Sequence, residues 1–167
     1  LNQRKGYLRL TTGRVDTSFV SARNTLTQRT FGPACEGSTR IDVRKMKEGD
    51  FAGLALLQRK FGQVGVKYEN GSKKIVMVSA QSERPVEIES VPLSGLTVYL
   101  KAECDFRDKA DTAWFSYSLD EKTWIPIGNK LKMEYSMPHF MGYRFGLFNY
   151  AGKTAGGHVD FDWFVIR

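Results

Sequence analysis

The chain has 167 residues, of which 41% are hydrophobic and 26% are charged, as is typical of a soluble globular protein. Lys and Arg outnumber Asp and Glu by 25 to 18, but they are spread along the sequence without a recognition-helix pattern or an RNA-binding signature, so we expect no nucleic-acid partner. No apolar run approaches the roughly 20 residues that a membrane-spanning helix needs, so we expect no membrane partner.

Short segments of alternating apolar and polar residues follow one another along the chain. In chain order, we expect strands at 7–10, 25–30, 38–43, 51–57, 63–69, 74–79, 86–89, 97–105, 112–118, around Trp124, and at 143–149 and 157–166. Asn70-Gly71 predicts a tight hairpin, because both residues accept the positive φ of a type I′ turn. Asp120 is expected to bond the backbone ahead of it and turn the chain. Only 16–21 and 46–50 have the character of brief helices.

About a dozen short strands at this spacing predict an all-β fold, a two-sheet antiparallel sandwich of the jelly-roll type. Residues 51–57 are almost continuously apolar, as expected of a strand buried between two layers, and this favours a sandwich over a barrel. The sequence has no internal repeat, no low-complexity tract and no linker. We therefore expect residues 1–167 to form one domain.

Nothing in the sequence predicts a complete catalytic site. Sugar hydrolysis needs two carboxylates about 5–9 Å apart across a cleft, and most acidic residues here lie at strand ends or in turns. His139 and His158 are far apart and have no metal-binding or triad spacing. The sequence has no nucleophile elbow, phosphate loop or dinucleotide fingerprint. We expect that the chain is not an enzyme by itself and has no catalytic residue.

Asp160 and Asp162 are candidate metal ligands in the last strand. Strict alternation would place both carboxylates on one face, with Phe161 and Trp163 on the other. Two hard oxygen ligands near a chain end could hold a structural Ca²⁺; the alternative is a polar stripe that faces solvent.

Cys35 and Cys104 are too few for a disulfide framework. They could pair if the fold brings them together, and buried free thiols are an equally good interpretation.

The richest mixture of aromatic and polar residues lies between Met141 and Tyr150. Alternation puts Arg144, Phe148 and Tyr150 on one face of a strand, and the residues between them point toward the core. Sugar rings stack on flat aromatic side chains, while their hydroxyls bond to Arg, Asn and Gln. The alternative is that these aromatic residues only fill the core. The candidate carbohydrate-binding residues are Arg144, Phe148, Asn149, Tyr150, Gln58 and Trp114.

Five strings carry a resemblance to a known family: GYLRLTTGR (6–14), ARNTLTQRT (22–30), GDFAGLALLQ (49–58), PHFMGYRF (138–145) and VDFDWF (159–164). In this order they resemble the C-terminal concanavalin A-like β-sandwich of family 43 glycoside hydrolases, which are β-xylosidases and α-arabinofuranosidases. The same module is also classed as a xylan-binding module of family 91. The resemblance implies a role in xylan degradation, with xylan or arabinoxylan as the polysaccharide.

The resemblance also implies a partner, because the catalytic acids of such enzymes lie in an N-terminal five-bladed propeller. In related enzymes a loop of the sandwich places an aromatic residue at the mouth of the propeller's active site. The matching loop here is 28–33, so Arg29 and Phe31 are candidates for this role. Family members also carry a segment upstream of the GYLRL string, so one edge strand is expected to precede Leu1. An extracellular or periplasmic location is favoured, with a cytoplasmic one left open.

The sequence thus predicts a non-catalytic accessory module that packs on a catalytic propeller and binds xylan. A purely structural sandwich that binds no sugar is the first alternative. A stand-alone lectin-like enzyme is the second, and it would need two acids, or a tyrosine and a base, converging in one cleft.

Overall fold

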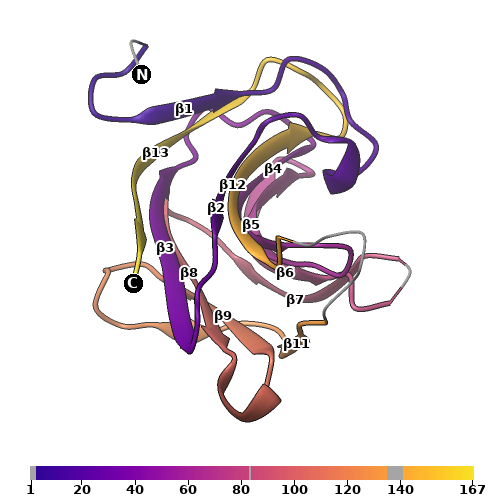
Figure 1. Ribbon diagram of the computed structural model, residues 1–167. Helices are drawn as coiled ribbons and strands as arrows, with labels where there is room; N and C mark the ends of the chain where they lie inside the picture. Colours follow the sequence, from indigo (N-terminus) through magenta and orange to yellow (C-terminus); the bar gives the residue numbers. More distant parts are fainter. Residues whose placement is uncertain (1–2, 83, 135–140) are drawn as a thin grey trace.

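The computed structural model describes residues 3–82, 84–134 and 141–167 as two antiparallel sheets packed face to face (Figure 1). Sheet 1 has the strand order β1-β13-β3-β8-β9-β10, with β11 also paired to β9. Its strands are β1 (Leu8–Thr11), β13 (His158–Ile166), β3 (Ala34–Asp42), β8 (Thr97–Asp105), β9 (Thr112–Ser118), β10 (Ile125–Pro126) and β11 (Leu131–Lys132). The two-layer, all-β prediction is confirmed.

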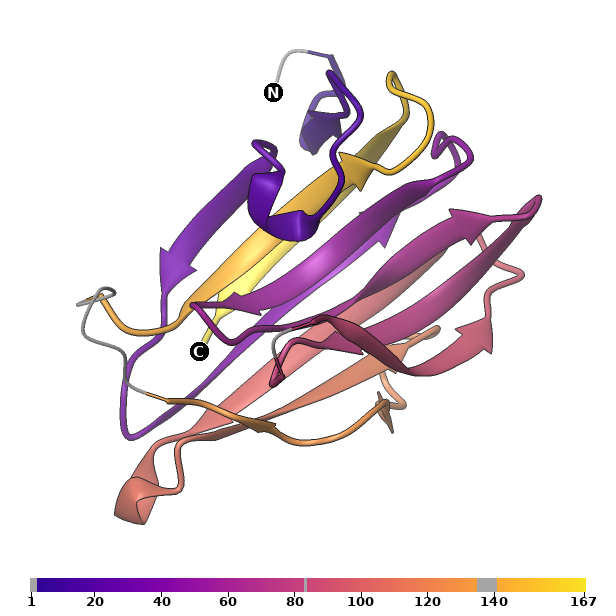
Figure 2. The same ribbon diagram turned by 90° about the vertical axis from the view of Figure 1, so that its right-hand side faces the viewer.

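Sheet 2 has the strand order β2-β12-β4-β5-β6-β7. Its strands are β2 (Thr25–Arg29), β12 (Arg144–Ala151), β4 (Asp50–Leu57), β5 (Gly62–Glu69), β6 (Ser72–Ser79) and β7 (Val86–Pro92). Figure 2 shows the long strands of the two sheets stacked as layers, with β12 beside β4 although they are far apart in sequence. Such long-range pairing is characteristic of jelly-roll topologies. No helix in the described part of the chain has the length and apolar character needed to cross a membrane.

Most of the predicted turns are confirmed, and one predicted helix is wrong. Asn70 and Gly71 both have positive φ (53° and 73°) and join β5 to β6, with Glu69 opposite Ser72. The Asp120 carboxylate accepts hydrogen bonds from the Lys122 and Thr123 amides, both at 2.8 Å. Residues 46–49 form no helix and lead through a turn into β4, because the Asp50 carboxylate accepts from the Lys47 amide and Gly49 has positive φ.

The main core lies between the sheets and is built from the inward residues of each strand. On β12 these are Phe145 and Leu147, both at most 1% exposed. The Phe145 ring lies against Gly37 of β3, where a Cβ atom would be only 2.7 Å from the ring. Gly37 is therefore the small residue that lets sheet 1 approach sheet 2 at this point.

A second apolar cluster covers the outer face of sheet 2, which is concave in Figure 1. The short 3-10 helix η1 (Phe19–Ser21) lies on this face and inserts Phe19 among the rings of Phe61 and Phe148, at centroid distances of 5.1 Å each. The predicted brief helix at 16–21 is thus confirmed in part. Ser18 caps η1 by accepting from the Ser21 amide. The segment before β2 therefore closes part of the concave face and leaves the rest open.

Candidate functional site

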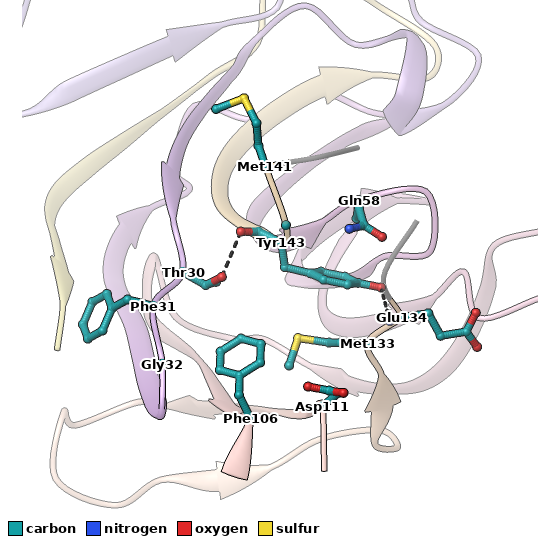
Figure 3. Close-up of a pocket in the computed structure, with 11 residues that line it drawn as sticks. Thr30, Phe31, Gly32, Gln58, Phe106, Asp111, Met133, Glu134, Met141 and Tyr143 are labelled. Atoms are coloured by element: carbon teal, nitrogen blue, oxygen red, sulfur yellow. Dashed lines mark hydrogen bonds between the residues drawn. The ribbon is translucent and has the colours of Figure 1, made fainter. Parts of the chain in front are cut away.

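One end of the sandwich carries a pocket of about 290 Å³ between loops of both sheets (Figure 3). The loop after β2 supplies Thr30, Phe31 and Gly32, and Phe106 follows β8. The remaining lining residues lie in the loops that follow β4 and β11 and in those that precede β9 and β12. They are Gln58, Asp111, Met133, Glu134, Met141, Gly142 and Tyr143. We call this cavity the loop pocket.

The Tyr143 ring lies at the centre of the loop pocket, with Phe106 and Met133 on one side and Gln58 on the other (Figure 3). The Tyr143 carbonyl accepts hydrogen bonds from the amide and the hydroxyl of Thr30, at 3.3 and 2.9 Å. Burial raises the pKa of the Tyr143 hydroxyl, which accepts from the Glu134 amide at 3.4 Å. The phenol therefore stays neutral at ordinary pH and fixes the floor of the pocket.

Two carboxylates line the loop pocket, but one of them is engaged elsewhere. The Glu134 carboxylate accepts from the Lys60 ammonium at 2.8 Å, and both side chains are well exposed. The backbone carbonyl of Asp111 accepts a hydrogen bond from the Met133 amide at 2.7 Å, and this bond holds the loop before β9 against the segment after β11. One of the two carboxylates of this pocket is thus ion-paired to a surface lysine.

A larger groove of about 660 Å³ adjoins the loop pocket on the concave face of sheet 2 and shares Gln58, Met141 and Gly142 with it. Its floor is formed by three adjacent strands, which place Arg144 opposite Leu57 on one side and opposite Arg29 on the other. Its remaining lining residues are Thr25 and Thr27 on β2, and Phe19, Val20 and Ala22 in and after η1. We call this the concave groove.

Arg144 is the central polar group of the concave groove. One guanidinium nitrogen donates to the Thr27 hydroxyl at 3.0 Å, and another lies 3.3 Å from the Met141 sulfur. Arg144 and Arg29 lie directly opposite each other on β12 and β2, and facing like charges disfavour the pairing of two strands. The groove therefore presents positive charge and hydrogen-bond donors among apolar walls.

Two of the predicted sugar-contacting residues lie together in the concave groove, and three others, all on β12, do not. Arg144 and Gln58 line the groove. Phe148 is fully buried beneath Phe19, so its ring has no free face for a sugar, and this prediction is corrected. Asn149 is also fully buried, and its amide donates to the Leu10 carbonyl at 2.7 Å, which ties β1 to β12. Tyr150 is half-buried, and burial raises its pKa to about 12.

Trp114 lies on the other sheet and cannot share a site with Arg144. It is 39% exposed on β9, opposite Glu103 on β8, with the Lys130 ammonium 5.2 Å from its ring centroid. It lines a separate depression of about 500 Å³ near the start of β3. The predicted sugar-contacting residues were chosen by side-chain chemistry, and the strand topology divides them between the two sheets.

Arg29 and Phe31 lie at the same end of the molecule as the loop pocket. Arg29 ends β2 and is exposed, and Phe31 follows in the loop with half of its surface exposed. In Figure 3 the Phe31 ring lies at the edge of the pocket and points away from Tyr143. Phe31 is thus an apolar side chain at the rim, directed outward.

Arginines surround both carboxylates of the expected calcium site. The Arg9 guanidinium donates to both oxygens of Asp160, at 2.7 and 2.9 Å, and Arg40 donates to Asp162. The hydrogen bonds from Arg9, together with one from Arg4, lower the pKa of Asp160 to about 2. Two carboxylates already paired with arginines are not open ligands for a cation.

The alternation assumed for the last strand also fails at one point. A β-bulge lies between Phe161 and Trp163, so Trp163 pairs with Arg40, and its ring lies 6.2 Å from that of Tyr99 on sheet 1. Phe161 enters the core, while Trp163 does not share its face. Among residues 3–82, 84–134 and 141–167, no three His, Cys, Asp or Glu side chains gather closely enough to hold a metal ion. His139 lies outside the described residues.

All 167 residues match the family model described as the β-xylosidase C-terminal concanavalin A-like domain. The chain belongs to this family. No curated protein sequence matches it. A solved structure described as a bifunctional GH43-CE protein of Bacteroides eggerthii is 64% identical with a TM-score of 0.97, over 99% of this chain and 21% of that one.

Other solved family 43 enzymes share the concanavalin A-like fold with this module. One, whose active site was engineered to display both endo-xylanase and exo-arabinofuranosidase activity, is 30% identical with a TM-score of 0.89, over 96% of this chain and 34% of that one. A GH43 protein from Bacillus licheniformis is 24% identical with a TM-score of 0.83, over 98% of this chain and 33% of that one. The chain therefore spans a fifth to a third of the family 43 proteins that it matches.

Sequence reasoning missed several residues that shape the two cavities of this family 43 module. Phe19 and Val20 come from a segment predicted only as a brief helix, and Phe106 and Met133 come from loops without a motif. The one available signal was Phe19 itself, an apolar residue in a short polar stretch that needs a surface to cover it. The contacts of Phe106 and Met133 depend on how loops of two sheets meet, which no local pattern encodes.

Proposed function

We propose that this chain is a non-catalytic accessory module of a xylan-degrading family 43 glycoside hydrolase of the β-xylosidase or α-arabinofuranosidase type. Its loop-pocket end packs on the catalytic propeller, and its concave groove contacts xylan or arabinoxylan. The observation that carries this proposal is the adjacency of the two cavities, which share Gln58, Met141 and Gly142 at the end where Phe31 projects.

The exposed apolar residues at this end support the docking part of the proposal. Phe31 and Met141 are each 50% exposed, and they flank the loop pocket. Two exposed apolar side chains on the same rim give a partner an apolar surface to cover. A phenyl ring at the mouth of a neighbouring active site would close one side of its pocket and favour release of single sugars.

The composition of the concave groove supports the sugar-binding part. Its walls are apolar, as the C–H face of a pyranose or furanose ring requires, and Arg144, Gln58 and two threonines supply hydrogen-bond partners for hydroxyls. Positive charge from Arg144 and Arg29 would also suit the acidic substituents of decorated xylans. The groove adjoins the loop pocket at Gln58, Met141 and Gly142, so a chain bound in it would lead toward the end that we place on the propeller.

Affinity gel electrophoresis on xylan and arabinoxylan tests the sugar-binding part with the 167-residue chain. We expect retardation by both polysaccharides, lost in Arg144→Ala and reduced in Gln58→Ala. Trp114→Ala is the control, because Trp114 is also a predicted sugar-contacting residue but lies on the other sheet. Unretarded migration of the parent chain on both gels would leave only the purely structural module.

Hydrolysis of an aryl-xyloside by the intact enzyme tests the docking part. We expect Phe31→Ala to lower kcat/KM roughly three- to tenfold, because about 1 kcal/mol of contact at the active-site mouth is removed. Ile125→Ala is the control, since Ile125 is also exposed but lies on β10, away from the loop pocket. Unchanged kinetics of Phe31→Ala would remove this loop from the mechanism.

A further inference from the structure

Cys35 and Cys104 lie directly opposite each other on the adjacent antiparallel strands β3 and β8. Directly opposite residues of an antiparallel pair have Cα atoms about 4.5 or 5.5 Å apart, and disulfides span Cα separations of about 4.4–6.8 Å. Both side chains are buried (7% and 3% exposed), and no disulfide joins them. The backbone thus already holds the two Cα atoms at a separation that a disulfide can bridge.

The surroundings distinguish the two sulfurs. Their neighbours shift the pKa values of the two thiols in opposite directions. Hydrogen bonding from the Cys104 thiol and then from the Phe31 amide lowers the pKa of Cys35 to about 7, whereas the neighbouring Cys35 sulfur and then burial raise the pKa of Cys104. Cys35 is therefore the better nucleophile of the pair.

A route from solvent reaches the pair. Both cysteines line the depression of about 500 Å³ that also holds Trp114. Arg107 and Arg167 line it as well, together with Glu36, Glu103 and Asp105. Arg107 is already paired with Asp105, so Arg167 is the arginine of this depression that can receive a carboxylate of a small disulfide.

We propose that Cys35 and Cys104 form a disulfide by exchange with a low-molecular-weight disulfide such as oxidised glutathione. The Cys35 thiolate attacks one sulfur of the small disulfide and forms a mixed disulfide, and a small thiolate leaves. Cys104 loses its proton and attacks the Cys35 sulfur, which releases the second small thiol. In sum, two protein thiols are oxidised to one disulfide, and one small disulfide is reduced to two thiols.

This crosslink would act at the root of the loop pocket. Phe31 lies four residues before Cys35, at the rim of that pocket, and Phe106 lies two residues after Cys104, with its ring inside the pocket (Figure 3). The Phe106 amide donates to the Pro33 carbonyl at 2.9 Å, so the two loops already share a backbone hydrogen bond. A covalent link between β3 and β8 would fix the spacing of the two rings. The pairing itself does not depend on sugar binding or on the propeller.

Intact-mass spectrometry of the folded 167-residue chain, incubated with oxidised glutathione and then alkylated in denaturant, tests the proposal. We expect a monomer that is lighter by two hydrogen atoms and takes up no alkylating reagent, and dithiothreitol should restore two alkylations. The thermal midpoint of the oxidised chain should rise by roughly 5–10 °C, because the crosslink closes a long loop. Cys35→Ser and Cys104→Ser are matched controls whose midpoints should not respond to the redox buffer.

The single variants also test the order of attack. Cys104→Ser should accumulate one glutathione on Cys35, since the resolving thiol is missing, while Cys35→Ser should remain largely unmodified. Two alkylations after oxidation, or a disulfide-linked dimer instead of a lighter monomer, would overturn the proposal. So would faster glutathione capture by Cys35→Ser than by Cys104→Ser. None of these readouts measures sugar binding or hydrolysis, so failure here is separate from failure of the proposed function.

Discussion

Arg9 and Asp160 lie directly opposite each other on β1 and β13, and the guanidinium holds both oxygens of the carboxylate. Arg4 donates to Asp160 and to Asp42 at 2.8 Å each, so the same group of charges also reaches β3. The first strand of the chain is thus joined to sheet 1 by ion pairs as well as by its backbone ladder. In a sandwich whose β1 is only four residues long, these contacts are expected to decide whether the strand stays paired.

We predict that Asp160→Asn lowers the free energy of unfolding by about 2 kcal/mol at pH 7, because the depressed pKa of Asp160 represents stabilisation of its charged form. A folded-state pKa of about 2, below the ordinary value of 3.8, means that this stability is present above pH 3.8 and is lost as pH falls toward 2. Urea unfolding at a series of pH values should show the gap between parent and variant closing over that range. A constant gap from pH 7 to pH 2 would contradict the assignment to charge.

Asp50 is predicted to have the opposite pH dependence. It is 1% exposed at the start of β4, one of its carboxylate oxygens has no hydrogen-bond partner, and burial raises its pKa to about 6. Its contribution to stability is therefore complete below pH 3.8 and is lost as pH rises through 6. We expect Asp50→Asn to be more stable than the parent by about 1–3 kcal/mol at pH 8 and nearly equal to it at pH 4.

Asparagine keeps an oxygen that can accept from the Lys47 amide, so the turn before β4 is preserved in this variant. Thermal unfolding at pH 4 and pH 8 measures the effect. A variant that is less stable at pH 8 would show that the ionised Asp50 has a partner in solution which offsets its burial.

Gly53 and Gly65 lie opposite each other on β4 and β5, where the strands leave no room for a side chain. A Cβ atom at Gly53 would lie 2.2 Å from the Val64 carbonyl oxygen, which belongs to the backbone and cannot turn aside. We predict that Gly53→Ala lowers the free energy of unfolding by about 1–3 kcal/mol, the usual cost of overpacking. Gly13→Ala is the control, since nothing lies within 4 Å of its Cβ position. Equal urea midpoints for the two variants would contradict the close approach.

Local patterns predicted the strands well because period-two alternation depends only on which face of a sheet is buried. The Asn70-Gly71 hairpin and the Asp120 turn were predictable for the same reason, since their chemistry lies within a few neighbouring residues. The arginine partners of Asp160 could not be predicted, because Arg9 lies 151 positions earlier in the chain. The β-bulge at Asp162 breaks a rule that the sequence otherwise obeys, so Trp163 was placed on the wrong face.

The candidate sugar site was likewise predictable only in part. Alternation correctly put Arg144 and Phe148 on one face of β12, but whether that face is open depends on η1, whose sequence has no motif. Arg144 remains accessible in the groove, while Phe148, four residues along the same strand, is covered by Phe19. The two residues therefore share a face and differ in environment.

This difference predicts separable effects of two substitutions on β12. Phe148→Ala removes a fully buried ring that packs on Phe19 and Phe51, and we expect a loss of about 3–5 kcal/mol in the free energy of unfolding. Arg144→Ala removes a half-buried side chain whose contacts are one hydroxyl and one sulfur, so we expect a change of less than about 1 kcal/mol. Urea unfolding measures both, and circular dichroism checks that each variant is folded.

Sugar binding, measured as retardation in affinity gels, should depend on Arg144 more than on Phe148, which is the reverse of their order in stability. We expect Arg144→Ala to migrate unretarded although its stability is close to that of the parent, because it loses the central donor of the concave groove. A Phe148→Leu variant keeps most of the buried volume and should bind as the parent does, since the residue has no exposed surface to offer. If Phe148→Leu loses binding while remaining folded, η1 must move away from the concave face when sugar binds, and the groove that contacts sugar is then wider than the one between η1 and β12.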